Sequence, residues 1–386
     1  MKKVTIYLYL LLLPSFWACH STAQQEKSTN EASITEQNRE LAPDKAARIQ
    51  ALVQKYHQQE GFTGAILAAQ NNQFVWKGGV GLARRTTNRK NTSQTKFLVG
   101  SVSKQFTSMI ILQLVQEGKI KLTDKAIQYL PFLPTEKATI TIHQLLSHTS
   151  GLAHYAGLRP GFSTFQYKSL TPMQYAKIIA RMRMHAKPNQ EMHYSSMGYI
   201  LLAVIAEKIT GKSYGQLIKE RIAKPLGLKN TGFTYYTEKL REFAVSYHLR
   251  GNEGNFRYEK DRPRSQTNTY STGGVHSSVE DLFTWLKSFQ TSRLLNDQLR
   301  KKLFTPNMNR YAYGWVINDK RLENQGVQSF TISHTGSVND YRAMVTMFGN
   351  SKDSQGKDMV IILSNCAPVK LRQMSAEIYQ LLKGKK

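Results

Sequence analysis

Strand-like apolar runs lie near both ends of the chain, and helical patterns fill most of the sequence between them. Near the N-terminal end, residues 63–83 contain two apolar runs separated by QNNQ, which is typical of a β-hairpin. The last third contains four more strand-like runs: YAYGWVIN, FTISHTG, YRAMVTMFG and DMVIILSN. A helix is expected after them, over about Lys370–Leu382. The clearest helix between these ends is MGYILLAVIAEKITG, which Gly211 ends. We therefore expect an α+β fold, with one antiparallel sheet flanked by helices and an inserted, mostly helical lobe.

The composition is that of a globular protein, because 40% of the residues are apolar and 20% are charged. We expect a signal peptide at residues 1–23 and a flexible, polar tether at residues 24–42. A folded domain should follow over residues 43–384. Its expected parts are an α/β lobe from about 43–125 and 270–384, and a helical lobe from about 126–269.

The N-terminus has the pattern of an export signal. Lys2 and Lys3 precede an apolar run that is too short for a transmembrane span, and small residues follow it. Cleavage before Cys19 would leave an N-terminal cysteine for lipid attachment, whereas cleavage after Ala23 would release a soluble protein. We expect an exported protein, either periplasmic or anchored to the cell envelope and its membrane by a lipid on Cys19.

The formal net charge is +27. Nucleic acid, anionic lipid and acidic cell-envelope polymers would all attract such a protein. We find no zinc-finger spacing and no basic helix that reads bases, so nucleic acid is not an expected partner. An anionic envelope polymer fits an exported protein best, and the alternative is a solvated cationic surface without a specific partner.

Cys366 has no expected disulfide partner, because the only other cysteine is either lipidated or removed. It follows the apolar run DMVIILSN, so we expect a buried structural thiol.

Several motifs resemble functional sites without meeting their structural requirements. GKSYG matches a nucleophile elbow, but a helix precedes it where a strand is required, so Gly211 is interpreted as a helix end and Ser213 as the next N-cap. AEKITGKS approaches a phosphate-binding loop, but Ala206 occupies the first glycine position.

Three histidines, His143, His148 and His154, lie close together in the sequence and raise the hypothesis of a metal site. No His-Glu-x-x-His pattern and no nearby carboxylate completes a ligand set. We expect core and hydrogen-bonding roles for them, and no metal or organic cofactor.

Ser-x-x-Lys occurs at three places: Ser93/Lys96, Ser101/Lys104 and Ser354/Lys357. Only Ser101 leads into a mostly apolar helix that is suited to burial, FTSMIILQLV. Burial lowers the pKa of a lysine, so Lys104, one turn along, can become the base that activates the Ser101 hydroxyl. The helix start adds free N–H groups close to the serine. The alternative is a helix-capping serine beside a solvated lysine.

Two further segments join this pair: MHYSSMGY, with Tyr194, Ser195 and Ser196, and SHTGSVNDY, with His334, Thr335, Gly336 and Ser337. Together the three motifs resemble the serine β-lactamase and penicillin-binding-protein superfamily, most closely its class C β-lactamase-like branch of D,D-peptidases, D-aminopeptidases and esterases. The resemblance covers roughly Asp44–Leu382. It includes six phrases in the family's order: GSVSKQFTS, ITIHQLLSHTSGL, YSSMGYILLAVIAEKITGKSY, PLGLKNTGF, STGGVHSSVEDLFTW and HTGS.

The resemblance implies a role for each matching residue. Ser101 would be the acylated nucleophile and Lys104 its base. Tyr194 would carry protons to the leaving group and help to activate the deacylating water. The backbone N–H groups of Ser101 and Ser337 would form the oxyanion hole, and residues 334–336 would form the strand edge along which substrate lies.

Two departures from the family pattern bear on the substrate. Ser196 stands where the family often has asparagine, and His334 stands where penicillin-recognising members usually have lysine, a permanent cation. Both departures argue against penicillins or peptides that end in D-Ala-D-Ala as the natural substrate. Arg342 is a candidate for the missing positive charge.

The sequence therefore predicts an exported serine hydrolase that cleaves an ester or an amide/peptide bond of a small or peptide-like substrate through an acyl-serine. A true β-lactamase or a D,D-carboxypeptidase is the alternative within the family. A catalytically silent protein that binds cell-wall polymers is the alternative from another class.

Overall fold

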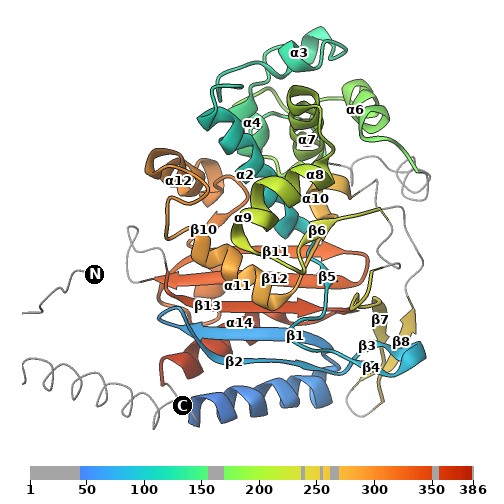
Figure 1. Cartoon of the computed structure of the whole chain (residues 1–386), viewed down its shortest axis with the longest axis vertical. Coiled ribbons are helices and arrows are strands. Elements are labelled where there is room, and N and C mark those ends of the chain that lie inside the picture. Colours follow the sequence, from blue (N-terminus) through green and yellow to red (C-terminus); the bar gives the residue numbers. More distant parts are fainter. Residues whose placement is uncertain are drawn as a thin grey trace, which may run out of the picture. The chain divides into compact units, whose positions relative to one another are not determined.

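The computed structural model describes residues 44–154, 169–235, 240–252, 255–260, 269–349 and 356–384. The expected signal peptide, tether and Cys19 lie outside these residues. The chain divides into the units Met1–Asp44 and Lys45–Lys386, and the site lies in the second. An antiparallel sheet with helices on its faces confirms the predicted fold class (Figure 1).

The main sheet has six antiparallel strands in the order β10-β11-β12-β13-β1-β2. Their bounds are β1 Gly64–Gln70, β2 Gln73–Val80, β10 Val316–Ile317, β11 Phe330–Val338, β12 Tyr341–Gly349 and β13 Asp358–Ser364. The hairpin expected near the N-terminal end is β1–β2, and two of the expected C-terminal runs pair as β11–β12. The sheet therefore joins residues from both ends of the described chain.

Both faces of the main sheet are covered. On β1, Ala65 and Leu67 belong to the larger hydrophobic core, which also contains residues of α2, α7 and α11. Ile66 and Ala68 point to the other face and belong to a second core, with residues of the helix 44–60 and of α14. Because both faces of β1 are buried, its sequence is continuously apolar instead of alternating.

The longer helices lie around this sheet and above it in Figure 1. Besides the helix 44–60, they are α2 Ser103–Gln116, α6 Pro172–Arg181, α7 Ser196–Thr210, α11 Val279–Ser288, α12 Asp297–Phe304 and α14 Leu371–Leu382. Shorter ones are α3 Ala126–Tyr129, α4 Ile142–Leu146, α8 Tyr214–Ile218, α9 Lys224–Leu226, α10 Tyr270–Gly273 and α13 Lys320–Glu323. Within the described ranges, no helix combines the length and the apolar character that crossing a bilayer needs.

The segment expected to be mostly helical, residues 126–269, also supplies strands. Within it lie β6 Gly232–Phe233, β7 Tyr247–Arg250 and β8 Arg257–Lys260. The other small strands of the described residues are β3 Leu82–Arg84, β4 Arg89–Lys90, β5 Phe97–Leu98, β9 Val275–Ser277 and β14 Cys366–Ala367. Together the small strands form a β3–β4 pair and the three-stranded sheets β14-β7-β8 and β5-β9-β6. Residues Tyr247–Arg250 alternate between more and less buried positions, as a half-buried strand requires, but their polar side chains hide this pattern in the sequence.

The helix α7 and its connection to α8 follow the predicted pattern. Residues Ser196–Ala206 are all buried, and the chain leaves α7 at Gly211, whose φ is +68°. Ser213 caps α8: its Oγ accepts from Gln216 N, and Ser213 N donates to Gln216 Oε1 at 2.8 Å. GKSYG is therefore a connection between two helices, as predicted, and not a nucleophile elbow.

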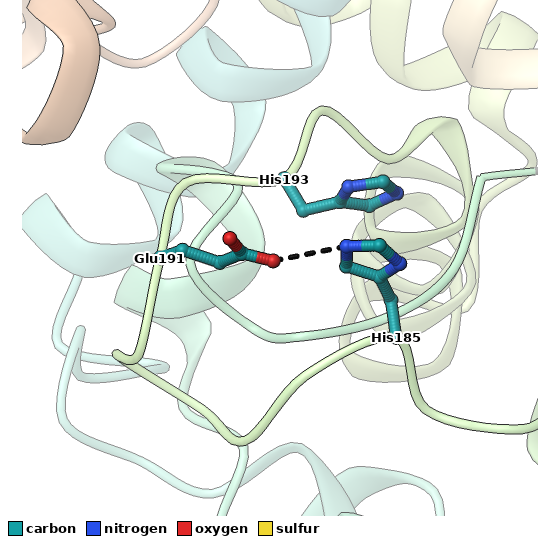
Figure 2. A group of neighbouring side chains, drawn as sticks. All are labelled: His185, Glu191 and His193. Atoms are coloured by element: carbon teal, nitrogen blue, oxygen red, sulfur yellow. Dashed lines mark ion pairs between the residues drawn. The ribbon is translucent and has the colours of Figure 1, made fainter.

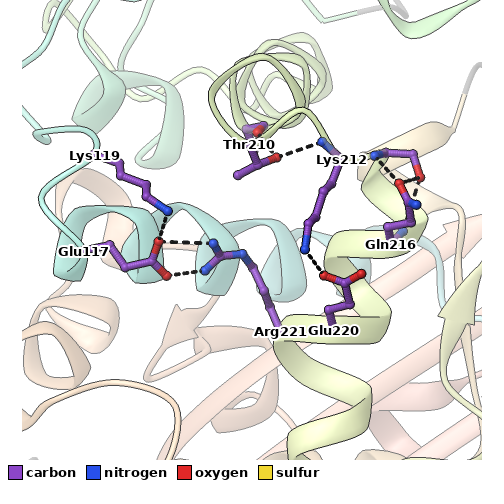
Figure 3. Close-up of polar contacts among 9 residues, drawn as sticks. Glu117, Lys119, Thr210, Lys212, Gln216, Glu220 and Arg221 are labelled. Carbon is purple, nitrogen blue, oxygen red and sulfur yellow. Dashed lines mark hydrogen bonds and ion pairs between the residues drawn. The ribbon is translucent and has the colours of Figure 1, made fainter.

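An ion-pair network fixes the far end of α2, the helix that follows Ser101. Glu117 accepts from both Nη atoms of Arg221, and Lys119 Nζ lies 2.8 Å from Glu117 Oε2 (Figure 3). These cations lower the pKa of Glu117 to about 2, chiefly through the Arg221 hydrogen bonds. The network links α2 to the π-helical segment Lys219–Ala223.

Cys366 is a buried free thiol, as predicted. Its Sγ accepts from Thr63 N and donates to Gly61 O, both at 3.4 Å. Burial raises its pKa, so the thiol stays protonated and unreactive.

Candidate active site

Ser101 and Lys104 meet at the start of α2. Ser101 lies in a 3-10 turn, Gly100–Val102, and α2 begins at Ser103. The serine thus precedes the α-helix instead of capping it, and Lys104 Nζ donates to Ser101 Oγ at 3.1 Å. The structure brings these two predicted residues into direct contact.

Lys104 is completely buried and donates a second hydrogen bond, to the carbonyl oxygen of Thr272, also at 3.1 Å. Burial lowers the pKa of Lys104 to about 7, because the apolar surroundings disfavour the ammonium form. Close to half of the molecules would then hold a neutral amine near pH 7. A neutral amine has a free electron pair and can accept a proton from a hydroxyl.

Two glycines allow β11 to approach the turn that carries Ser101. A Cβ on Gly100, whose φ is +54°, would overlap the backbone nitrogen of Ser337. A Cβ on Gly336 would overlap the carbonyl oxygen of Val99. The backbone of Ser337 therefore lies against the turn, which is where the predicted oxyanion hole requires it.

Tyr194 lies in the segment that leads into α7, beside Lys104. The Lys104 nitrogen is 4.9 Å from the centroid of the Tyr194 ring. Ser195 fastens this segment, because its backbone N–H donates to His148 Nδ1 at 3.1 Å and its hydroxyl donates to Ala153 O at 2.8 Å. The His148 ring also packs on Tyr194, with centroids 4.3 Å apart. Tyr194 is thus held close to the serine–lysine pair.

His334 lies on β11 and is a neutral imidazole. Its Nδ1 is 2.7 Å from the carbonyl oxygen of Thr335, so Nδ1 carries the proton, and Nε2 accepts from Tyr311 Oη at 3.2 Å. Burial, and to a smaller degree the charge on Lys104, lowers the pKa of His334 to about 3. His334 therefore supplies no positive charge at neutral pH.

Ser196 begins α7 and is buried. Its Oγ lies 3.5 Å from His154 Nε2, while Lys104 directs its hydrogen bonds to Ser101 and Thr272. A serine at this position is too short to replace an asparagine carboxamide between the lysine and the substrate.

Each of the three clustered histidines forms a hydrogen bond, as predicted, although His148 Nε2 is buried without a partner among the described residues. His143 Nδ1 lies 2.6 Å from Tyr313 Oη, and His154 lies beside Ser196. His148 accepts from the backbone of the tyrosine segment and packs on Tyr194. His148 is thus a positioning residue for Tyr194, a role that sequence reasoning had not given it.

A pocket of about 630 Å³ opens at this point. Its walls include six of the predicted residues: Ser101, Tyr194, His334, Thr335, Gly336 and Ser337. Lys104 lies behind the wall because it is fully buried, and Ser196 is likewise not part of the lining. The serine hydroxyl, the tyrosine and the edge of β11 therefore share one cavity.

Three arginines and one aspartate add charge to the pocket wall: Arg321, Arg342, Arg372 and Asp319. Asp319 is buried and pairs with Arg321 Nε at 3.0 Å and with Arg372 Nε at 3.7 Å. Arg372 also donates to Thr335 Oγ1 at 3.4 Å, and Arg342 donates to the carbonyl oxygens of Asn339 and Tyr341. These four groups together carry a net positive charge. The sequence had indicated Arg342 alone as a source of that charge, and the structure adds Arg321 and Arg372.

The site residues that sequence reasoning missed lie far from the motifs or act through the backbone. Thr272 contributes a carbonyl oxygen, which no side-chain type reveals. Arg321 and Arg372 come from α13 and α14, and nothing in their local sequence separates them from the many other basic residues.

The sequence matches the Beta-lactamase family over residues 49–380. The putative penicillin-binding protein PbpX of Bacillus subtilis (strain 168) is 28% identical over 392 residues, which cover 97% of this chain and 92% of PbpX. Protein flp of Staphylococcus aureus (strain MW2) is 28% identical over 84% of this chain, which spans only 64% of the length of flp.

The fold also matches a solved structure. The octameric penicillin-binding protein homologue from Pyrococcus abyssi superimposes with a TM-score of 0.73 at 24% identity, covering 88% of this chain and 78% of that one. The family match defines the class, a serine hydrolase. The chain belongs to the beta-lactamase family, which confirms the resemblance predicted from its three motifs.

Proposed function

We propose that this protein is an exported serine hydrolase that cleaves an ester or amide bond of a small or peptide-like substrate through an acyl-serine intermediate. The observation that carries the proposal is the 3.1 Å contact between Lys104 Nζ and Ser101 Oγ at the wall of the pocket. A serine hydroxyl is a poor nucleophile until a neighbouring group takes its proton. Lys104, with a pKa of about 7, can take that proton at neutral pH.

In the acylation step, Ser101 Oγ attacks the substrate carbonyl carbon while Lys104 Nζ takes the hydroxyl proton. The backbone N–H groups of Ser101 and Ser337 stabilise the negative charge that develops on the carbonyl oxygen. The bond to the leaving group then breaks, and the departing oxygen or nitrogen receives the proton from Lys104 by way of Tyr194. Ser101 is left as an ester of the acyl group.

In the deacylation step, a water molecule attacks the carbonyl carbon of this ester. Tyr194 and Lys104 accept the proton of the water and return one to Ser101 Oγ as the acyl–serine bond breaks. The products are a free carboxylic acid and the original serine.

Two features favour esters and simple amides over β-lactams. His334 is buried and neutral, so no cation stands where penicillin-recognising members have lysine, and any attraction of a carboxylate must come from the pocket arginines at other positions. Ser196 lies beside His154 and offers no carboxamide at this position. A true β-lactamase or a D,D-carboxypeptidase remains the alternative within the family.

The arginines favour a substrate with an anionic group. Arg321 and Arg372 share one carboxylate, that of Asp319, and Arg342 adds a third guanidinium to the same wall. Guanidinium groups bind carboxylates and phosphates strongly when water is partly excluded. We propose that an anionic group of the substrate lies against this wall while its carbonyl lies at Ser101.

A substrate panel tests the proposal. Nitrophenyl acetate, nitrophenyl hemisuccinate, D-amino-acid amides and a chromogenic cephalosporin would be offered to the parent protein and to Ser101→Ala. We expect hydrolysis of an ester or an amide that Ser101→Ala loses, with the hemisuccinate preferred over the acetate and the cephalosporin turned over slowly. Equal hydrolysis by Ser101→Ala would contradict the serine mechanism, and rapid cephalosporin turnover would favour a β-lactamase.

A second candidate function rests on the net charge of +27. A protein without catalytic activity could use the pocket and a cationic surface to bind an anionic cell-wall polymer. Polymer pull-down that survives Ser101→Ala, together with no hydrolysis by the parent, would favour this binder over the enzyme.

Export is supported by the sequence of residues 1–23 alone. Fractionation of cells that express the full chain should place the protein outside the cytoplasm. Release of the Cys19→Ser variant from the membrane fraction would indicate a lipid anchor, and an unchanged soluble distribution would indicate cleavage after Ala23. Retention of the full-length chain in the cytoplasm would contradict export.

A further inference from the structure

A second group of polar side chains lies in the segment between α6 and Tyr194. His185, Glu191 and His193 come together there. Figure 2 shows the Glu191 carboxylate directed at the His185 ring and the His193 ring stacked on the His185 ring. His185 Nε2 lies 2.9 Å from Glu191 Oε1, and the two ring centroids are 3.6 Å apart. One nitrogen or oxygen atom of each residue lies within 4.8 Å of the others. Three potential ligand atoms therefore converge outside the pocket.

The three side chains match a known type of metal ligand set. Two imidazoles and one carboxylate bind Zn²⁺ in many proteins, with a water molecule in the fourth position. Bond lengths near 2.0–2.1 Å place the ligand atoms of a tetrahedral site roughly 3.4 Å apart. His185 and Glu191 are 44% and 51% exposed, so an ion can reach the site, and the side chains can close the gap by rotating out of their present pairing and ring stacking.

The backbone already holds both histidines in place. His185 N donates to Gly151 O at 2.8 Å, and His193 N donates to His148 O at 2.9 Å. Between them, Asn189 N donates to the carbonyl oxygen of Thr149 at 2.8 Å. The segment 185–193 therefore runs along residues 148–151, and little backbone ordering remains to oppose metal binding.

We propose that His185, Glu191 and His193 bind a divalent transition-metal ion, with Zn²⁺ as the best match, and that this ion clamps the segment immediately before Tyr194. Nitrogen ligands favour Zn²⁺ and similar ions over Mg²⁺ or Ca²⁺, which prefer all-oxygen sites. The ion would cross-link the two ends of the segment 185–193. Its role is structural and stands apart from the proposed hydrolysis.

Calorimetric titration of the full chain, without an affinity tag, with ZnCl₂ tests the site. The variants are His185→Ala and Glu191→Gln, and His248→Ala is the matched control. His248 is 43% exposed and faces one carboxylate, Asp340, at 3.3 Å. We expect one Zn²⁺ per parent chain, binding about tenfold weaker or more in each ligand variant, and no change in the control. Thermal melts in chelator should show that all four proteins are equally folded.

Hydrogen exchange tests the clamp with the same proteins. Zn²⁺ should slow amide exchange within residues 185–193 in the parent and in His248→Ala, but not in His185→Ala. Failure of the parent to bind Zn²⁺, or equally tight binding by His185→Ala and Glu191→Gln, would overturn the site. Tight binding without slower exchange in this segment would overturn the clamp. Because neither measurement involves hydrolysis, these outcomes are independent of the proposed function.

Discussion

Lys104 Nζ lies 3.1 Å from Ser101 Oγ, and the protonation state of the lysine sets the direction of the hydrogen bond between them. An ammonium group can only donate, so it holds the serine oxygen as an acceptor. A neutral amine can keep its donation to Thr272 O and accept from the serine hydroxyl instead. This second arrangement is the start of proton transfer. Because burial lowers the pKa of Lys104 to about 7, this second arrangement is populated near neutral pH.

The first prediction concerns pH. Since the reaction requires neutral Lys104, kcat/KM for a neutral ester should rise with pH through an apparent pKa near 7 and then level off. Lys104→Met should lower kcat/KM by about 10²–10⁴-fold and remove this rise. The measurement is a pH–rate profile of both proteins. A parent profile that is flat from pH 5.5 to 8.5 would contradict the role of Lys104.

The pH dependence of the free energy of unfolding provides an independent check on the pKa of Lys104. Burial lowers the pKa of Lys104 in the folded state, so between about pH 7 and 10.5 the unfolded chain binds more protons than the folded chain. The cost of burying the charge is therefore full below pH 7 and declines as pH rises. The free energy of unfolding of the parent should increase from pH 7 to pH 9 relative to Lys104→Met, by up to about 1.4 kcal/mol per pH unit. Urea unfolding at each pH measures the difference.

The second prediction concerns the Tyr194 phenol. Tyr194→Phe keeps the ring and its packing on His148 but removes the group that carries protons. We expect kcat to fall by about 10²–10⁴-fold with little change in KM. Tyr258→Phe is the control, because Tyr258 Oη donates to Gly61 O and does not line the pocket. Loss of activity through a higher KM alone would assign Tyr194 to binding instead.

The third prediction compares two glycines with positive φ. Alanine at Gly100, φ +54°, would overlap Ser337 N, whereas alanine at Gly118, φ +68°, would meet no atom within 4 Å. Backbone strain should cost about 1–2 kcal/mol of stability in both variants, and the overlap with Ser337 N should add a further loss in Gly100→Ala alone. Only Gly100→Ala should also lower kcat strongly, since it pushes β11 away from Ser101. Parallel melts and kinetics test this, and full activity in a folded Gly100→Ala protein would exclude the predicted oxyanion hole.

The fourth prediction concerns the arginines of the pocket. Arg372→Gln should lower kcat/KM for nitrophenyl hemisuccinate by about 10–100-fold, because a hydrogen bond between two charged groups is lost. The value for nitrophenyl acetate should stay within about twofold, since the acetyl group carries no anionic group for Arg372 to bind. Arg250→Gln is a suitable control, because Arg250 is 60% exposed and pairs with Glu259. Equal losses with both esters would show that Arg372 supports the pocket wall without recognising charge.

Much of the fold could be predicted from the sequence because burial leaves a clear pattern there. The two apolar runs around QNNQ predicted the β1–β2 hairpin, and the mostly apolar residues 197–206 predicted the buried helix α7. The positive φ at Gly211 explains why the sequence marked that helix end so clearly. The strands β7 and β8 were missed, because they are short and carry many charged residues.

The motifs located most of the candidate site, because Ser101, Tyr194 and residues 334–337 line one pocket and Lys104 contacts Ser101. Groups outside the motifs could not be foreseen. The Thr272 carbonyl belongs to the backbone, and the pocket arginines meet only through tertiary packing. His185 and His193 lie on an irregular segment, where sequence spacing does not predict which side chains converge.

Labelling of Ser101 tests the central claim most directly. The full chain would be treated with a fluorophosphonate probe and digested, and the modified peptide identified by mass spectrometry. We predict one probe per chain on Ser101, no labelling of Ser101→Ala, and much slower labelling of Lys104→Met. An unlabelled parent protein, or a probe attached to Ser195 or Ser196 instead, would contradict the account.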